Sequence, residues 1–267
     1  MKDFDTIESV TETVCRLLGI APPENSASAP PENLVCRLRE MLGGEARRIL
    51  LYCPDAIGRK FLEAHSELEN AIIEDAPLKT ELRSMFPPIT PVCYSSMFTG
   101  AAPEFHGNTG RDKSVLVCDT LFDALLRSGF HPAIVAVKGS TIERIFRGRE
   151  MDYFAEEYDP EVTERTLALV EIGAHDVVVL YHQEYDDTLH EERPDSARAI
   201  LAAGRHIAAF RKLVKAARLH WIGDSFAYAF LPDHGAHVDP ATGRGTHGAD
   251  IPDDMEVLHF WGAEPGI

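Results

Sequence analysis

The sequence predicts an α/β protein with a mostly parallel central sheet flanked by helices on both faces. Four short apolar runs have the length and composition of buried strands, at 48–53, 133–137, 176–181 and 226–231. Helical spacing of apolar residues occurs between and beside these runs, at 59–73, 119–129, 160–173 and 195–217. Strands that alternate with helices favour parallel β-α-β units. A chain of 267 residues, 45% of them hydrophobic, is long enough to bury one large core of this kind.

The N-terminal part of the chain differs from the rest in its pattern of apolar residues and in its proline content. Residues 5–19 carry Ile7, Val10 and Val14 at helical spacing, and a second helix is expected over 33–42. Between them lies a linker, 21–31, that is rich in Pro and Ser. We therefore separate a helical segment, 1–45, from an α/β domain, 46–267. A packing role, or homo-oligomerisation through the N-terminal helices, would account for this segment.

The charge of the chain restricts its partners. Asp and Glu number 43 against 26 Lys and Arg, which gives a formal net charge of −17. An acidic surface repels the phosphate backbone, so we expect no binding to nucleic-acid polymers. A small anionic substrate remains compatible with this charge, because bound cations reverse the local field in a pocket.

Cysteine usage and hydropathy predict a cytoplasmic protein. The five cysteines are odd in number and form no CxxC pair, which disfavours disulfide scaffolds and cysteine-based zinc sites. No apolar stretch approaches the length of a membrane span, so no membrane association is expected. The N-terminus, Met1-Lys2-Asp3-Phe4-Asp5, lacks the basic and apolar regions of a signal peptide.

Metal-ligand residue types follow three of the four predicted strands. Asp55 follows the first run, Asp186 and His190 follow the third, and Asp233-His234 follow the fourth. In open α/β sheets ligands gather at the carboxyl ends of the strands. Asp186 and His190 are four residues apart and would share one face of a helix, as chelating side chains must, although the adjacent Asp187 is an alternative to Asp186.

Two further segments carry candidate chemistry. His247 lies between glycines in Gly245-Thr246-His247-Gly248, a loop with few apolar residues. Thr90 follows a proline-rich approach, and the residues from Tyr94 to Phe98 after it look helical. A hydroxyl at a helix N-terminus meets unpaired N–H groups that favour a phosphoryl group, but the same position also suits a plain N-cap.

The order of these motifs resembles the nucleotide pyrophosphatase and phosphodiesterase branch of the alkaline phosphatase superfamily. The resemblance covers about 47–262 and rests on motifs that follow one another in the same order as in that branch. They are Asp55, Thr90 with Thr99-Gly100, Pro103-Glu104-Phe105-His106-Gly107, Asp186-Asp187-Thr188-Leu189-His190, Asp233-His234-Gly235 and Gly245-Thr246-His247-Gly248. The resemblance implies an alkaline-phosphatase-like catalytic domain over 46–267, without a large cap.

What the resemblance implies for the site is specific. One divalent metal ion would be held by Asp186, His190 and His247. A second would be held by Asp55, Asp233 and His234, with the Thr90 oxygen as a further ligand. Mixed imidazole and carboxylate ligation suits zinc, or manganese if the sites are more open. Thr90 would be the catalytic nucleophile and would become phosphorylated and then hydrolysed.

The substrate implied is a small phosphorylated molecule, such as a nucleotide. Relatives bind a phosphoryl oxygen with an Asn a few residues after His-Gly, whereas here Asn108 follows Gly107 at once and Arg111 stands nearer the expected place. An Arg would hold a phosphate through two parallel hydrogen bonds, which favours a monoester. The resemblance therefore implies a metal-dependent phosphoester hydrolase similar to a phosphodiesterase or nucleotide pyrophosphatase, with a phosphomonoesterase or phosphomutase of the same superfamily, or a non-catalytic binding protein that keeps the fold, as alternatives.

Overall fold

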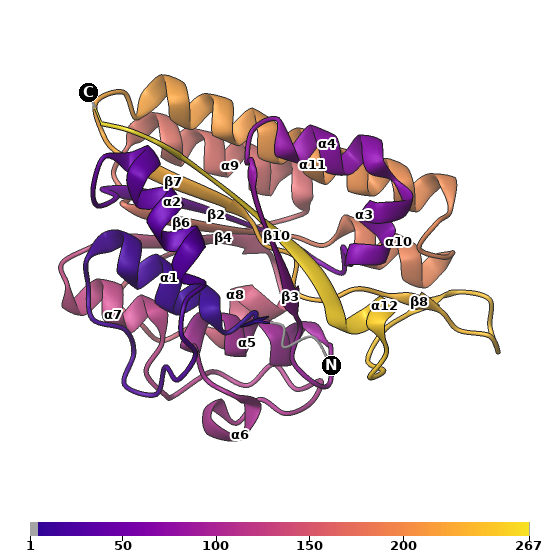
Figure 1. The fold of residues 1–267 in the computed structure, drawn as a ribbon. Coiled ribbons are helices and arrows are strands. Elements are labelled where there is room, and N and C mark those ends of the chain that lie inside the picture. The colour runs from indigo at the N-terminus through magenta and orange to yellow at the C-terminus, as the bar shows by residue number, and fades with distance from the viewer. Residues whose placement is uncertain (1–4, 267) are drawn as a thin grey trace.

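An eight-stranded sheet forms the centre of the protein, which a computed structural model describes over residues 5–266 (Figure 1). Residues 1–4 of the N-terminal helical segment expected over 1–45, and residue 267, lie outside this range. The spatial order of the strands is β1-β3-β10-β7-β2-β6-β4-β5, and β10 alone runs antiparallel to its neighbours in this sheet. The strands are β1 (Asp5–Thr6), β2 (Arg48–Pro54), β3 (Leu78–Arg83), β4 (Pro132–Val137), β5 (Asp152–Glu156), β6 (Val177–His182), β7 (Phe226–Phe230) and β10 (Glu256–Glu264). The mostly parallel α/β sheet that the sequence predicts is thus confirmed.

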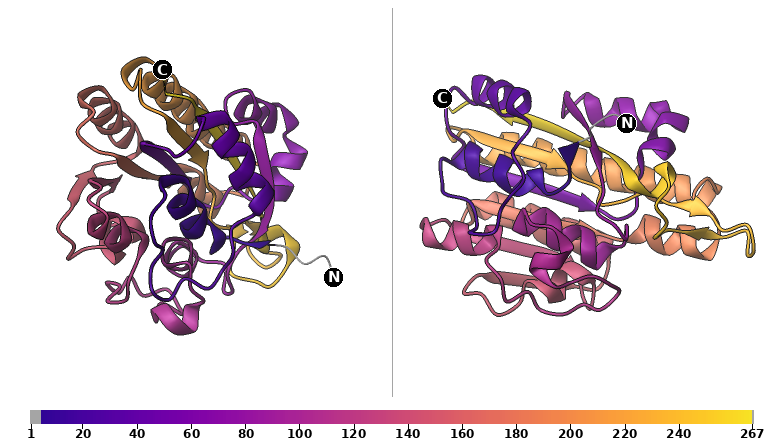
Figure 2. Two further views of the ribbon diagram at one scale, coloured as in Figure 1. Left: turned by 60° about the vertical axis from the view of Figure 1, so that its left-hand side comes forward. Right: turned by 60° about the horizontal axis from the view of Figure 1, so that its bottom comes forward.

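Helices cover both faces of this sheet (Figures 1 and 2). They are α1 (Ser9–Leu18), α2 (Glu32–Leu42), α3 (Arg59–Ala64), α4 (Ser66–Ile73), α5 (Thr90–Thr99), α6 (Pro103–His106), α7 (Leu121–Arg127), α8 (Thr141–Ile145), α9 (Asp159–Ile172), α10 (Glu184–Glu191), α11 (Ala197–His220) and α12 (Pro252–Met255). A small hairpin of β8 (His237–Val238) and β9 (Gly245–Thr246) follows β7. Within residues 5–266, no helix is both long and apolar enough to cross a bilayer.

The central strands are apolar along their whole length because both of their faces are covered. Successive side chains of a strand point to opposite faces, and β2 divides accordingly. Ile49 and Leu51 pack in the core beneath α5, α7 and α8, whereas Leu50 and Tyr52 pack in the core beneath α9 and α11. All four of these side chains are fully buried.

The N-terminal helices pack on one of these two cores. Val10 and Val14 of α1 and Leu38 of α2 are buried in the same cluster as Met97 of α5. The Thr11 hydroxyl donates a hydrogen bond to the Met97 carbonyl at 2.8 Å. These contacts bury the apolar faces of both helices against the core of the same chain. The boundary at residue 45 and the dimerisation of this segment stay predictions.

The topology places the ends of four strands side by side. β2 pairs in parallel with β6 on one edge and with β7 on the other, so these strands end at the same edge of the sheet. β4 lies next to β6 and ends at this edge as well. The loops and helices that follow these strands therefore meet in one place.

A buried carboxylate fixes the start of α10, the helix that follows β6. Asp159, at the start of α9, accepts hydrogen bonds from the backbone N–H groups of Gln183 (3.0 Å) and Glu184 (2.9 Å). The next N–H, of Tyr185, donates to Nε2 of His206 at 3.3 Å. The first N–H groups of a helix have no partner within the helix, and a negative charge there is favourable. Asp159 and His206 therefore cap α10 from two other helices.

Asp159 is ionised in this position. Burial opposes its charged form, but contacts with His206, His182 and the Gln183 N–H outweigh that effect and lower the pKa of Asp159 from 3.8 to about 2. A group with a lowered folded-state pKa stabilises the fold above its unfolded pKa and stops doing so as the pH falls.

We expect Asp159→Asn to lower the free energy of unfolding by about 1 to 2 kcal/mol near pH 6, because the cap of α10 loses its charge. Urea unfolding measures this difference, which should shrink as the pH is lowered toward about 3. Glu161→Gln is the matched control, since Glu161 is an exposed residue of the same helical turn. An equal loss in both variants would show that Asp159 does not anchor α10.

Candidate two-metal active site

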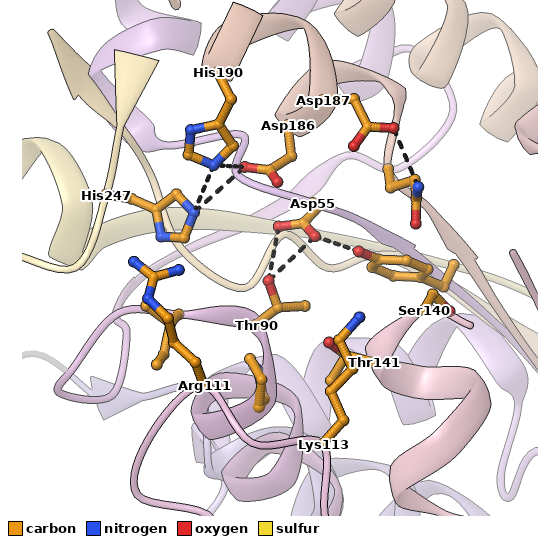
Figure 3. A pocket seen from close by; sticks show the side chains of 14 residues that line it. Asp55, Thr90, Arg111, Lys113, Ser140, Thr141, Asp186, Asp187, His190 and His247 are labelled. Carbon is orange, nitrogen blue, oxygen red and sulfur yellow. Dashed lines mark hydrogen bonds and ion pairs between the residues drawn. The ribbon is translucent and has the colours of Figure 1, made fainter. Parts of the chain in front are cut away.

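Thr90 is the first residue of α5 and lies at the base of a pocket (Figure 3). Ile89, with extended backbone, occupies the N-cap position, and no side chain caps this helix. The Thr90 hydroxyl instead donates toward the carboxylate of Asp55, with its oxygen 3.2 Å from Oδ2 and 3.4 Å from Oδ1. Thr90 therefore does not act as a plain N-cap, and Pro91 is accommodated because no helical hydrogen bond needs its missing N–H in the first turn.

Asp186, His190 and His247 come together above Thr90. Asp186 and His190 lie on one face of α10, as their spacing predicts, and the loop after β9 brings His247 to them. Oδ1 of Asp186 lies 3.3 Å from Nε2 of His190 and 3.5 Å from Nε2 of His247. Asp187 points elsewhere, because its carboxylate accepts hydrogen bonds from the Tyr158 hydroxyl (2.7 Å) and the Gln183 amide (3.1 Å). The geometry thus favours Asp186 over Asp187 as a ligand.

Asp55, Asp233 and His234 form a second group, fully buried at the ends of β2 and β7. Nε2 of His234 lies 3.5 Å from Oδ1 of Asp55 and 3.4 Å from Oδ2 of Asp233. The two groups adjoin one another, because the rings of His234 and His247 stack with their centroids 4.1 Å apart. All of the ligands predicted from the sequence therefore gather in two neighbouring clusters beside Thr90.

Backbone carbonyls orient each of the three imidazoles. Nδ1 of His190 faces the Gly245 carbonyl, Nδ1 of His234 faces the Gly235 carbonyl and Nδ1 of His247 faces the Pro88 carbonyl, each at 3.0 Å. A carbonyl can only accept, so Nδ1 carries a proton in each ring and Nε2 is the atom left to face the carboxylates. The three Nε2 atoms then converge on the carboxylates, and each presents a lone pair to a cation when its ring is neutral.

This convergence is electrostatically unfavourable unless positive charge is added. Burial, and then the neighbouring carboxylates, raise the pKa of Asp55 well above its usual range, and burial does the same for Asp233. Burial and the adjacent His247 hold the pKa of His234 well below its usual value. Oδ1 of Asp186, Oδ2 of Asp233 and Nε2 of His234 are buried without a hydrogen-bond partner among residues 5–266. Buried polar atoms are nearly always satisfied, so these atoms fit cation ligands.

A third group of similar composition is mostly satisfied by hydrogen bonds. Asp159, His182 and His206 also lie within reach of one another. However, Asp159 is bound by backbone N–H groups, and both nitrogens of His182 are engaged, by the Tyr52 hydroxyl at 2.6 Å and by the Thr163 hydroxyl at 3.2 Å. Nδ1 of His206 is buried without a partner among residues 5–266, but the carboxylate and the other imidazole of this group are occupied, whereas in the groups beside Thr90 two carboxylates present free oxygens.

The pocket over Thr90 has a volume of about 230 Å³. Fourteen residues line it: Asp55, Ile89, Thr90, Pro91, Arg111, Lys113, Ser140, Thr141, Tyr181, Gln183, Asp186, Asp187, His190 and His247. Arg111 is among them, in agreement with its predicted place. Asn108 is not, because it is buried and its amide donates to the Ser95 hydroxyl (2.9 Å) and the Ser114 carbonyl (3.2 Å). Asn108 therefore holds the loop that carries Arg111 in place, and its side chain does not face the pocket, where a substrate-binding role would place it.

Tyr181 and Lys113 line the pocket although neither is among the site residues predicted from the sequence. The Tyr181 hydroxyl, at the end of β6, donates to Oδ2 of Asp55 and so occupies one side of that carboxylate. Lys113 reaches the pocket from the loop between α6 and α7, and its Nζ donates to the Gly139 carbonyl at 3.1 Å. Tyr181 ends a predicted strand and Lys113 lies on a long loop, and neither position predicts a contact by itself.

Comparison with known proteins gives matches at the level of structure only. No protein-family profile matches the chain, and no curated protein matches its sequence. Murine ectonucleotide pyrophosphatase/phosphodiesterase 5, an inactive variant in complex with AMP, superposes with a TM-score of 0.63 at 13% identity, over 83% of this chain and 88% of that one. The human protein of the same name gives a TM-score of 0.58 at 12% identity, over 82% and 88%.

A second kind of neighbour is phosphonoacetate hydrolase from Sinorhizobium meliloti, in complex with phosphonoformate. It superposes with a TM-score of 0.50 at 18% identity, over 72% of this chain and 57% of that one. At identities this low, the structural similarity establishes the fold alone. Both kinds of neighbour have the fold that the order of the motifs implied. The chain therefore has the fold of the alkaline phosphatase superfamily, as found in its nucleotide pyrophosphatase and phosphodiesterase branch.

Proposed function

We propose that this protein is a metal-dependent phosphoester hydrolase that acts through a phosphorylated Thr90. The observation that carries the proposal is the placement of the Thr90 hydroxyl, 3.2 Å from Asp55, beside two clusters of buried, unsatisfied ligand atoms. The structural neighbours bind AMP and phosphonoformate, which both present a phosphorus oxyanion. These facts support hydrolysis at phosphorus.

The ligand sets would hold two divalent cations. Asp186, His190 and His247 would hold one, and Asp55, Asp233 and His234 would hold the other, with the Thr90 oxygen at its edge. Their mixture of imidazoles and carboxylates suits zinc first and manganese second. When bound, such ions supply the positive charge that lowers the pKa of a nearby hydroxyl and neutralises phosphoryl oxygens.

The side chains of the protein would perform the two chemical steps. The hydrogen bond from Thr90 to Asp55 directs the hydroxyl lone pairs away from the carboxylate. The N-terminal end of α5 favours the negative charge of the phosphoryl group that Thr90 would receive. The Thr90 hydroxyl gives up its proton to solvent and its oxygen forms a bond to phosphorus as the bond to the leaving oxygen breaks, and the leaving alkoxide takes one proton from solvent, so that the number of protons is unchanged. Water then attacks the phosphothreonine, which releases phosphate and restores Thr90.

The ligand assignment can be tested by the metal content of two adjacent variants. We expect Asp186→Asn to lose close to one equivalent of zinc or manganese per chain, because its oxygen faces His190 and His247. Asp187→Asn should keep the wild-type content, because Asp187 is bound by Tyr158 and Gln183. Elemental analysis after metal loading and dialysis measures both. A loss in Asp187→Asn alone would reverse the assignment.

Metal binding should also appear as added stability. At a free metal concentration about a hundredfold above the dissociation constant, each ion stabilises the fold by about 2.7 kcal/mol. Chelation should therefore lower the melting temperature of the wild-type protein, and Asp186→Asn should show a smaller change. A wild-type melting temperature that does not respond to zinc, manganese or chelator would contradict the two-metal proposal.

The nucleophile can be tested with 4-nitrophenyl phosphate, bis(4-nitrophenyl) phosphate and 4-nitrophenyl sulfate, with and without chelator. We expect Thr90→Ala to lower kcat by at least about a thousandfold while its metal content is largely kept. Thr90→Ser should retain turnover because it keeps the hydroxyl. Mass spectrometry of acid-quenched wild-type protein should find the phosphoryl group on the peptide that contains Thr90. Undiminished turnover by Thr90→Ala would contradict the assignment of Thr90 as nucleophile. If the wild-type protein binds metal and substrate but shows no turnover, the non-catalytic alternative is favoured.

A further inference from the structure

The wall of the pocket opposite the metal ligands is cationic. Arg111 and Lys113 both line the pocket, and their side chains rise toward Thr90 from the loop between α6 and α7 (Figure 3). Among residues 5–266, neither forms an ion pair with a carboxylate, although Asp and Glu outnumber Lys and Arg in the chain by 43 to 26. Two unpaired cations at one place in so acidic a protein indicate that an anion from outside is their partner.

The loop that carries these cations is held in place. The Asn108 amide joins it to Ser95 of α5, and the Asn108 N–H donates to Nδ1 of His106 at 3.2 Å. The other nitrogen of His106 lies 2.8 Å from the Ser96 hydroxyl. Burial lowers the pKa of His106 to about 4, so the ring stays neutral and acts as a fixed link. Arg111 and Lys113 therefore project from a loop that is fastened at its start to the same helix as Thr90.

The surroundings of Lys113 leave its charge incompletely compensated. Its Nζ makes one hydrogen bond, to the Gly139 carbonyl, although an ammonium group can donate three. Burial, and then the charge of Arg144, lower the pKa of Lys113, and the charges of Asp55 and Asp187 offset this effect only in part. An anion in the pocket would offset this repulsion and accept the remaining N–H donors.

The pocket is poorly suited to a nucleobase. Tyr181 is the one aromatic residue among those that line it, and its hydroxyl is bound to Asp55. The volume of about 230 Å³ is below the range of about 300 to 1,000 Å³ in which pockets for drug-sized ligands fall. Small size, few apolar walls and two cations fit a compact and highly charged molecule.

We propose that the substrate of this site is a small phosphate monoester that carries a second anionic group, a carboxylate or another phosphate, held by Arg111 and Lys113. This inference rests on the proposed function and narrows its substrate class. The ligand clusters would face the phosphoryl group, and the guanidinium of Arg111 would bind the second anion through two parallel hydrogen bonds. Lys113 would act on the same anion as a point charge.

The test compares matched substrates that differ in one group. 2-Phosphoglycolate and ethylene glycol bisphosphate carry a second anion, whereas ethyl phosphate has a methyl group in that position. We expect kcat/KM of the metal-loaded wild-type enzyme to be about tenfold to hundredfold higher for at least one of the charged substrates than for ethyl phosphate. The preferred one identifies the second anion.

Variants then assign the preference to the two cations. Arg111→Met and Lys113→Met should each lower kcat/KM for the preferred charged substrate by about tenfold more than they lower it for ethyl phosphate. Lys138→Met is the matched control, because Lys138 is an exposed cation at the end of β4 that does not line the pocket. It should leave both substrates unaffected.

A binding measurement keeps the proposal independent of turnover. Metal-loaded Thr90→Ala should bind at least one of 2-phosphoglycolate and ethylene glycol bisphosphate more tightly than ethyl phosphate. In the double variant Thr90→Ala with Lys113→Met, this difference in affinity should disappear. Equal binding of all three ligands would overturn the second-anion proposal even if phosphoester hydrolysis is found. Selective binding without any turnover would instead overturn the proposed hydrolysis and leave this inference standing. A preference for bis(4-nitrophenyl) phosphate over every monoester would also contradict it.

Discussion

The structure depends on one electrostatic constraint, which is the convergence of Asp55, Asp186 and Asp233 with three imidazoles at a single edge of the sheet. Isolated charges in a protein interior cost several kcal/mol each unless they are paired. Here three of the ligand atoms have no hydrogen-bond partner within residues 5–266. The same chain satisfies Asp159 with backbone N–H groups, so the open acceptors beside Thr90 reflect a specific arrangement. Cations are the natural complement of such a cluster.

The remainder of the fold holds these repelling groups in position. β6, β2 and β7 are adjacent and buried on both faces, so their ends are fixed relative to one another. Ala56, directly after Asp55, has a φ of 62° and places its N–H 3.2 Å from Oδ1 of Asp233. A left-handed conformation is costly for a residue with a side chain and persists only where the surroundings enforce it. Glycine at position 56 would adopt this conformation without strain.

The sequence predicts the central strands and the ligands better than the edges and the pocket walls. β2, β4, β6 and β7 are recognisable because each is an uninterrupted apolar run, buried on both faces. β3 (Leu78–Arg83) and β5 (Asp152–Glu156) are half-exposed and mixed in polarity, so they escape the same criterion. The ligands are predictable because their order along the chain resembles that of a known family. Lys113 and Tyr181 are not, since only the tertiary structure brings the loop after α6 to the end of β6.

The distribution of charge around the pocket links the acidic composition to the recognition of an anion. A net charge of −17 repels anions at long range, but screening confines this effect to about 8 Å at physiological ionic strength. Inside the pocket the local charges decide, and they are arranged on two walls. The carboxylates and imidazoles on one wall attract cations, while Arg111 and Lys113 on the other have no carboxylate partner among residues 5–266. A ligand with one anionic group can bind only at the wall whose carboxylates and imidazoles would hold metal ions. A ligand with two anionic groups can bind there and also to Arg111 and Lys113. The same argument explains why Asn108 need not touch the substrate, because its hydrogen bonds to Ser95 and Ser114 fix the loop from which the opposite wall is built.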